Sequence, residues 1–180
     1  MTNFSEIRLF TKPIRFKWLL VSFVMEWNVE KIISGGQTGV DRAALDIAAE
    51  FGIPCGGWCP RGRRAEDGSI PGRYPLQESS SPDYPVRTDL NIQDSDGTLI
   101  LTWGPPAGGT LLTLKLARKH HKSHLVLDLL EGPDLDTVRV WGHKNKIRVL
   151  NVAGPREGEA AGIHKKAFEF LQKIFTPSQE

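Results

Sequence analysis

The sequence has few cysteines, almost no net charge and no apolar run of membrane-spanning length. Two cysteines among 180 residues cannot form a disulfide framework, so we expect a cytoplasmic protein in a reducing environment. A formal net charge of +2, from 23 Lys and Arg against 21 Asp and Glu, provides no basic field for duplex nucleic acid or a membrane surface. We therefore expect neither nucleic acid nor a membrane as a partner.

The first part of the chain contains one apolar stretch, Trp18 to Met25. It is far shorter than the ~20 residues that span a bilayer. Glu26 ends it and no cleavage pattern of small residues follows, which disfavours a signal peptide. The chain has the length of one domain. We predict an N-terminal extension over residues 1–24, outside the core, and a single domain over residues 25–180.

The rest of the chain alternates short aliphatic runs with helical patterns. The runs predict strands at 31–34, 97–102, 124–129 and 147–154, with a weaker one at 53–57. Helices are predicted at 40–51 and 110–119, and again after the last strand, where five residues form one apolar stripe. These are Ile163, Ala167, Phe170, Leu171 and Ile174. The alternation predicts an α/β fold, a three-layer Rossmann-like domain with a mostly parallel sheet of about five strands.

Two segments break this alternation. Residues 54–85, which we call the flap, hold six of the 12 prolines and five of the 18 glycines. Three flap arginines, Arg61, Arg63 and Arg64, are candidates to close over a ligand, or they form a solvated loop that Glu66 and Asp67 neutralise. Residues 131–146 are predicted to be irregular.

Three glycine-containing turns follow predicted strands: SGGQTGVDR, WGPPAGGT and AGPREG. Because the carboxyl ends of parallel strands share one edge of a sheet, the three turns should meet in one crevice. Glycines and helix N-termini there favour an anion, so a phosphorylated small molecule is the expected partner. None of the turns has the Walker A or GxGxxG spacing. The candidate ligand residues are Gly35, Gly36, Thr38, Gly39, Asp41, Arg42, Gly108, Gly109, Thr110, Gly154 and Arg156.

Several of these residues also have a structural interpretation. Thr38 and Thr110 are both suited to be helix N-caps, and Asp41 would complete a capping box with Thr38. Arg42 lies near the positive end of a helix and therefore needs an anionic partner, either the ligand or an acidic neighbour.

Arg156 presents the same choice in the third turn. It could clamp a phosphate or pair with Glu157 or Glu159.

Metal ligands are not indicated. Cys55 and Cys59 are spaced four apart without further soft ligands, and are expected to be buried structural thiols. His120, His121 and His124 fall at a helix end and a strand start, where polar or cationic residues are favoured. We predict no dedicated protein metal site.

Seven stretches of the sequence resemble those of a known protein family: ISGGQTGVDRAALD, GGWCPRGRRAEDG, PLQE, DSDGTLILT, GGTLLTLKLARK, LVLDL and VLNVAGPRE. Over about residues 30–175 the chain resembles the molybdenum carrier proteins, a circularly permuted YpsA-like branch of the SLOG superfamily. The resemblance implies a Rossmann-like fold, a molybdenum cofactor (a phosphorylated pterin) or a nucleotide as ligand, and a homo-oligomer, dimer or tetramer. Related LOG-type members hydrolyse nucleoside monophosphates with a glutamate after the GT turn. In this sequence the segment after GGT contains Lys115 and no carboxylate, so it departs from the LOG-type pattern.

Three functions therefore stand as hypotheses. The first is a carrier that binds the molybdenum cofactor or a nucleotide-derived ligand at the carboxyl edge of the sheet. The second is a LOG-type nucleotide N-glycosidase or phosphate-ester hydrolase, with Asp41 as its candidate catalytic carboxylate. The third is a nucleotide sensor that reports to a partner protein.

Overall fold

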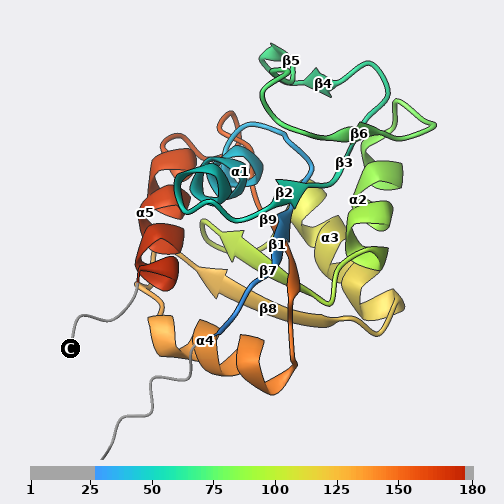
Figure 1. Ribbon diagram of the computed structural model, residues 1–180. Helices are drawn as coiled ribbons and strands as arrows, with labels where there is room; N and C mark the ends of the chain where they lie inside the picture. The colour runs from blue at the N-terminus through green and yellow to red at the C-terminus, as the bar shows by residue number, and fades with distance from the viewer. Residues whose placement is uncertain (1–26, 177–180) are drawn as a thin grey trace, which may run out of the picture.

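The computed structural model describes residues 27–176. The predicted extension over residues 1–24 lies outside the described residues. Within them, five parallel strands form a central sheet in the order β2-β1-β9-β7-β8 (Figure 1). The strands are β1 (Lys31–Ile33), β2 (Cys55–Gly56), β7 (Gly97–Thr102), β8 (Ser123–Asp128) and β9 (Val149–Ala153).

Helices cover both faces of this sheet. In Figure 1, α1 (Val40–Glu50) and α5 (Ile163–Phe175) lie on one face, and α2 (Tyr84–Gln93) and α3 (Gly108–Lys119) lie on the other. The fifth helix, α4 (Leu135–Lys144), packs against α5. The predicted three-layer α/β fold with about five mostly parallel strands is therefore confirmed. No helix among residues 27–176 has the length and apolar character needed to cross a membrane.

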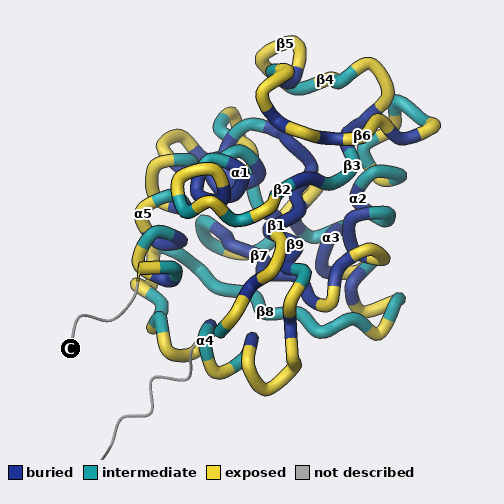
Figure 2. Tube along the Cα trace, viewed as in Figure 1, coloured by how far each residue is buried: buried dark blue, intermediate teal, exposed yellow. Residues whose placement is uncertain are grey.

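The core follows from the sequence patterns. Every residue of β7 is buried, which explains its continuous apolar run. Ala43, Ala44 and Ala48 are fully buried on α1, and their small side chains allow close packing. All five residues of the predicted stripe on α5 are buried. Figure 2 shows the largely buried strands β7 and β9 at the centre of the domain.

Two helices were not predicted. The segment expected to be irregular, residues 131–146, contains α4, whose N-cap Asp134 accepts hydrogen bonds from the backbone N–H groups of Asp136 and Thr137. The interior Gly142 of α4 weakens the helical pattern, but a Cβ there would lie 2.1 Å from the Trp27 ring. Close packing on Trp27 thus explains a glycine that looks like a helix breaker.

Its proline and its polar residues hid the helix α2 in the sequence. It begins at Tyr84, inside the segment interpreted as flap, after the N-cap Asp83 and with proline in its first turn. Proline at that position is compatible with a helix, because the first N–H groups have no helical partner. This helix supplies one wall of the site described below.

The predicted N-caps were wrong for both threonines. Helix α1 begins at Val40, as predicted, but its N-cap is Gly39, at φ 73°. A Cβ at position 39 would lie 2.4 Å from the carbonyl oxygen of Pro155, so the close approach of the third turn requires a glycine there. Helix α3 begins at Gly108 after Ala107, which places Thr110 inside the first turn.

The flap is an ordered substructure. It contains a parallel pair, β3 (Trp58–Cys59) with β6 (Gln77–Glu78), and a hairpin of β4 (Arg64–Ala65) with β5 (Gly68–Ser69). We call residues 64–69 the flap tip. A second apolar cluster fastens the flap to α1 and consists of Leu45, Cys59, Ile70, Tyr74 and Leu76.

Candidate functional site

A cavity of about 430 Å³ opens at the carboxyl edge of the sheet. All three glycine-containing turns contribute to its lining, as the parallel topology predicts. Helices α2 and α3 supply the remaining walls. The lining residues are Gln37, Asp41, Tyr84, Pro85, Arg87, Thr88, Gly108, Gly109, Leu112, Thr113, Ala153, Gly154, Arg156 and Glu159.

Five of the predicted ligand residues line this cavity: Asp41, Gly108, Gly109, Gly154 and Arg156. The other six, Gly35, Gly36, Thr38, Gly39, Arg42 and Thr110, are not among its lining residues. Thr38 and Arg42 contact the flap, and Thr110 lines a neighbouring hollow.

Arg87 is the one charged lining residue that the sequence analysis did not name. Its Nη1 lies 3.3 Å from Oδ2 of Asp41, and both side chains are largely buried. Arg87 also lies directly over Gly35, where a Cβ would be 1.8 Å from Nη1. The glycine at the end of β1 therefore leaves room for the guanidinium. Recognising Arg87 from sequence would have required recognising α2 as a helix.

The environment of Asp41 is unusual for a carboxylate. It is 3% exposed and accepts a hydrogen bond from the backbone N–H of Gln37 at 3.3 Å. Burial raises the pKa of Asp41, while Arg87 and the Gln37 hydrogen bond oppose that rise. The carboxylate is thus held as the partner of Arg87 at the inner wall of the cavity.

The amino end of α3 is open to the cavity. Gly108 and Gly109 are exposed, and a Cβ at position 109 would meet nothing within 4 Å. The first N–H groups of a helix lack helical acceptors and carry the positive end of its dipole. This part of the wall can therefore receive an anion.

Thr110 faces a different space. The residue is 3% exposed, and its hydroxyl has no hydrogen-bond partner within residues 27–176. It lines a second hollow of about 330 Å³, together with Trp103 and Pro155. Gly108 and Glu159 line both spaces, so the second hollow adjoins the cavity.

The predicted cations of the first and third turns both have acidic partners. Arg42 binds the two carboxylate oxygens of Asp67 at 2.6 and 2.8 Å. Arg156 lies 3.1 Å from Glu159, as one interpretation predicted, and 3.3 Å from Glu66. Two of these acids, Glu66 and Asp67, belong to the flap tip, which is therefore docked on the edge of the site.

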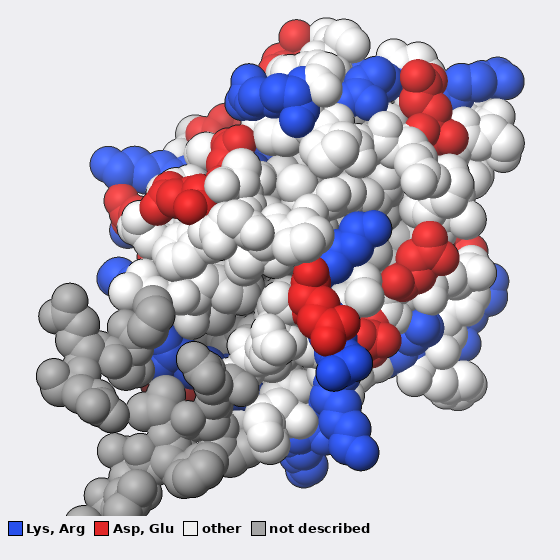
Figure 3. All heavy atoms as spheres, in the orientation of Figure 1, with Lys and Arg blue, Asp and Glu red and all other residues white. Residues whose placement is uncertain are grey.

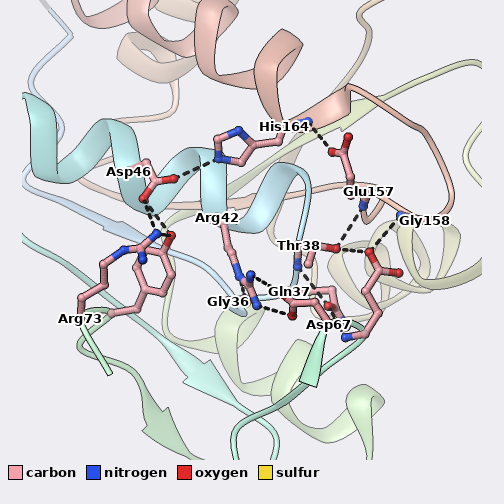
Figure 4. Close-up of polar contacts among 12 residues, drawn as sticks. Gly36, Gln37, Thr38, Arg42, Asp46, Asp67, Arg73, Glu157, Gly158 and His164 are labelled. Carbon is pink, nitrogen blue, oxygen red and sulfur yellow. Dashed lines mark hydrogen bonds and ion pairs between the residues drawn. The ribbon is translucent and has the colours of Figure 1, made fainter. Parts of the chain in front are cut away.

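Thr38 lies at the centre of this docking. Its hydroxyl donates a hydrogen bond to Glu66 and accepts one from the backbone N–H of Glu157 at 3.1 Å. Figure 4 shows Thr38, which belongs to the first turn, beside the loop of Glu157 and Gly158. Thr38 therefore joins the flap to two strand-end turns.

The flap arginines have separate positions. Arg63 donates to the carbonyl oxygens of Ile70, Pro71, Tyr74 and Leu76, so its side chain holds the flap together. Arg61 and Arg64 are exposed. At the flap end of the molecule, cationic and anionic side chains alternate on the surface (Figure 3). Closure of these arginines over a ligand stays a prediction.

Both cysteines are free thiols. Cys59 is fully buried and Cys55 is partly buried. Burial raises the pKa of both thiols. Over residues 27–176, no group of three or more His, Cys, Asp or Glu side chains is arranged to hold a metal ion.

Comparisons with known proteins agree with this architecture. The family model described as "Circularly permutated YpsA SLOG family" matches residues 32–175. A crystal structure from Syntrophus aciditrophicus SB, named "Putative molybdenum carrier protein", is 43% identical. The match covers 82% of this chain and 96% of that chain, with a TM-score of 0.80. No curated protein is significantly similar to this chain.

Proposed function

This chain belongs to the circularly permuted YpsA SLOG family, and from that premise we propose that it is a carrier of the molybdenum cofactor, a phosphorylated pterin. A nucleotide-derived ligand is the other member of the same ligand class. One observation supports the proposal most: a cavity of about 430 Å³ is lined both by the open end of α3 and by α2. That volume lies within the range of small-molecule sites, roughly 300–1,000 Å³.

The cavity is suited to a ligand with a phosphate at one end and a ring at the other. Gly108 and Gly109 at the start of α3 offer backbone N–H groups to the anionic end of the ligand, and Gly154 lines the cavity at the end of β9. Tyr84 and Leu112 give aromatic and apolar surface for a planar heterocycle. The proposed ligand therefore spans the cavity, from the end of β9 to the α2–α3 wall.

Two arginines set the charge of the cavity. Arg87 is held by Asp41, and Arg156 by Glu159 and Glu66. An incoming phosphate adds a negative charge that these cations can share, since guanidinium groups bind phosphate through paired N–H donors. In this proposal Asp41 does not touch the phosphate. It positions Arg87.

A hydrolase is the second candidate, and one observation favours it. Asp41 lines the cavity and its pKa is raised by burial, a combination that is common among catalytic carboxylates. In an N-glycosidase it would stabilise the positive charge that develops on the ribose ring. The hydrolase and carrier hypotheses use the same cavity and differ in whether a bond is broken.

The experiment is to denature the purified protein and identify released small molecules by mass spectrometry. Molybdopterin and nucleoside monophosphates are then titrated, and each nucleotide mixture is searched for free base. We expect binding without base release. The variant Arg87→Gln should weaken binding by tenfold or more, whereas Arg148→Gln, at an exposed ion pair with Glu30, should not. If no phosphorylated compound binds, the proposal is wrong.

A further inference from the structure

Glu66 occupies a site whose donors are suited to an oxyanion. Its carboxylate accepts hydrogen bonds from the Thr38 hydroxyl and, at 2.9 Å, from the backbone N–H of Gly158. The Nε of Arg156 lies 3.3 Å from its second oxygen. The donors thus come from two of the three strand-end turns, and the anion from the flap.

The position of Gly158 shows how closely the carboxylate approaches the chain. A Cβ at position 158 would lie 2.6 Å from Oε2 of Glu66. The φ of Gly158 is not among the positive values, so the backbone conformation itself does not require glycine. Glycine is required because the Glu66 oxygen occupies the space that a Cβ would fill.

Flap docking has an independent attachment one residue away. Asp67 binds Arg42 through both carboxylate oxygens, and the backbone N–H of Glu66 donates to Oε1 of Gln37 at 3.0 Å. The flap tip would therefore stay attached if the Glu66 side chain left its site. That side chain is 20% exposed and lies beside solvent.

The site adjoins the cavity through Arg156, which lines the cavity and contacts Glu66. A phosphate monoester carries about −1.5 to −2 charges at neutral pH, against one on a carboxylate. It also has three terminal oxygens for the hydroxyl, N–H and guanidinium donors. Arg156 also pairs with Glu159 at 3.1 Å. It therefore keeps one carboxylate partner when the phosphate replaces Glu66.

We propose that Thr38, Gly158 and Arg156 form an oxyanion site, that Glu66 fills it as an internal anion, and that the phosphate monoester of the ligand replaces Glu66. The Glu66 side chain then turns into solvent while Asp67 keeps the flap tip in place. This assignment rests on the proposed function and refines it: the phosphate lies beside Arg156, and the first N–H groups of α3 then face another polar group of the same ligand. In this assignment Glu66 competes with the ligand's phosphate, and this competition lowers the protein's affinity for the ligand.

The test uses inorganic phosphate and adenosine monophosphate as probes of the full-length protein. The variant Glu66→Gln removes the competing charge and is expected to bind both probes about tenfold more tightly, which is about 1.4 kcal/mol. The matched control is Glu78→Gln, the same change at another flap carboxylate, which accepts from Gly62 outside the site. The control is expected to change binding less than twofold. Equal or weaker binding by Glu66→Gln would overturn the assignment.

A measurement on the unmodified protein covers the case in which the variant fails to fold. The Glu66 side-chain carboxyl carbon is followed by NMR while phosphate is added. We expect its pKa to rise toward the ordinary value as the three donors are lost, and a constant pKa at saturating phosphate contradicts the exchange. The two proposals fail separately. If organic phosphates bind the wild-type protein and Glu66→Gln equally tightly, the oxyanion site is wrong but the carrier proposal stands. If Glu66→Gln binds inorganic phosphate more tightly and no organic phosphate binds either protein, the oxyanion site stands and the carrier proposal is wrong.

Discussion

The guanidinium of Arg87 on α2 lies 3.3 Å from the carboxylate of Asp41 on α1, at the inner wall of the cavity. The pair links the first strand-end turn to a helix that follows the flap. Because both side chains are largely buried, each offsets the charge of the other in place of solvent. A ligand anion would therefore meet a cation whose position is fixed before binding.

Loss of Arg87 should destabilise the fold. In Arg87→Gln the Asp41 carboxylate stays buried without a cation, and we expect the free energy of unfolding to fall by about 3 kcal/mol at pH 7. The double variant Arg87→Gln with Asp41→Asn removes both charges and should recover most of that loss. Urea unfolding of the three proteins measures this, and a single variant as stable as the double variant would contradict the pairing.

Glu66 and Asp67 should titrate at lower pH than ordinary carboxyl groups. Partial desolvation raises the pKa of Glu66, but hydrogen bonds from Thr38 and Gly158 and the charge of Arg156 outweigh it and lower the pKa overall. For Asp67 the hydrogen bond from Arg42 is the main reason that the pKa is lowered. NMR titration of side-chain carboxyl carbons measures both values.

The sign of the pH dependence follows from these directions. A pKa that is lower in the folded state stabilises the fold above the ordinary carboxyl pKa of about 4 and stops doing so as the pH falls through the lowered value. Asp41, whose pKa is raised, behaves in the opposite way, and its contribution is lost as the pH rises. The variant Thr38→Ala should raise the pKa of Glu66 and leave that of Asp67 unchanged. Equal shifts at both would show that the contacts are not separate.

Gly39 should not tolerate a side chain. The variant Gly39→Ala combines a positive φ with a Cβ that would lie 2.4 Å from the Pro155 carbonyl oxygen, and we expect a loss of at least about 2 kcal/mol. Gly52→Ala is the matched control, because Gly52 also has a positive φ but open space around it. It should cost about 1 kcal/mol. Similar losses at both positions in thermal unfolding would exclude the clash as the cause.

Gly109 gives a prediction about binding rather than stability. A Cβ at Gly109 or at Gly72 meets nothing within 4 Å, and neither φ is positive. Both alanine variants should therefore keep wild-type stability within about 0.5 kcal/mol. Only Gly109→Ala adds a methyl group at the open end of α3, and calorimetry should find weaker binding of the phosphorylated ligand by that variant alone.

Strong local patterns made the sheet and three of the helices predictable. The apolar run at β7 and the stripe from Ile163 to Ile174 on α5 each have one physical interpretation, burial against the sheet. The meeting of the three turns also followed from parallel topology alone. Helices α2 and α4 lacked such patterns. Helix α2 has a proline in its first turn, and α4 has an interior glycine, Gly142, whose packing on Trp27 is visible only in the structure.

Partners at long range were beyond sequence reasoning. The predicted need of Arg42 for an anion is met by Asp67, and Arg156 shares Glu66 with Thr38. Both acids lie in a segment whose charges looked self-neutralised. Only the folded flap shows that those carboxylates neutralise other turns.

The central claim is that a phosphorylated ligand binds in the cavity at the carboxyl edge of the sheet. The most direct measurement is a ¹H–¹⁵N NMR titration with adenosine monophosphate and, under anaerobic conditions, with molybdopterin. We predict that at least one of them moves the amide signals of Gly108, Gly109 and Gly154, while those of Lys31 and Asp94 near the opposite edge stay in place. Unchanged spectra with both ligands, or changes confined to that opposite edge, would contradict the claim.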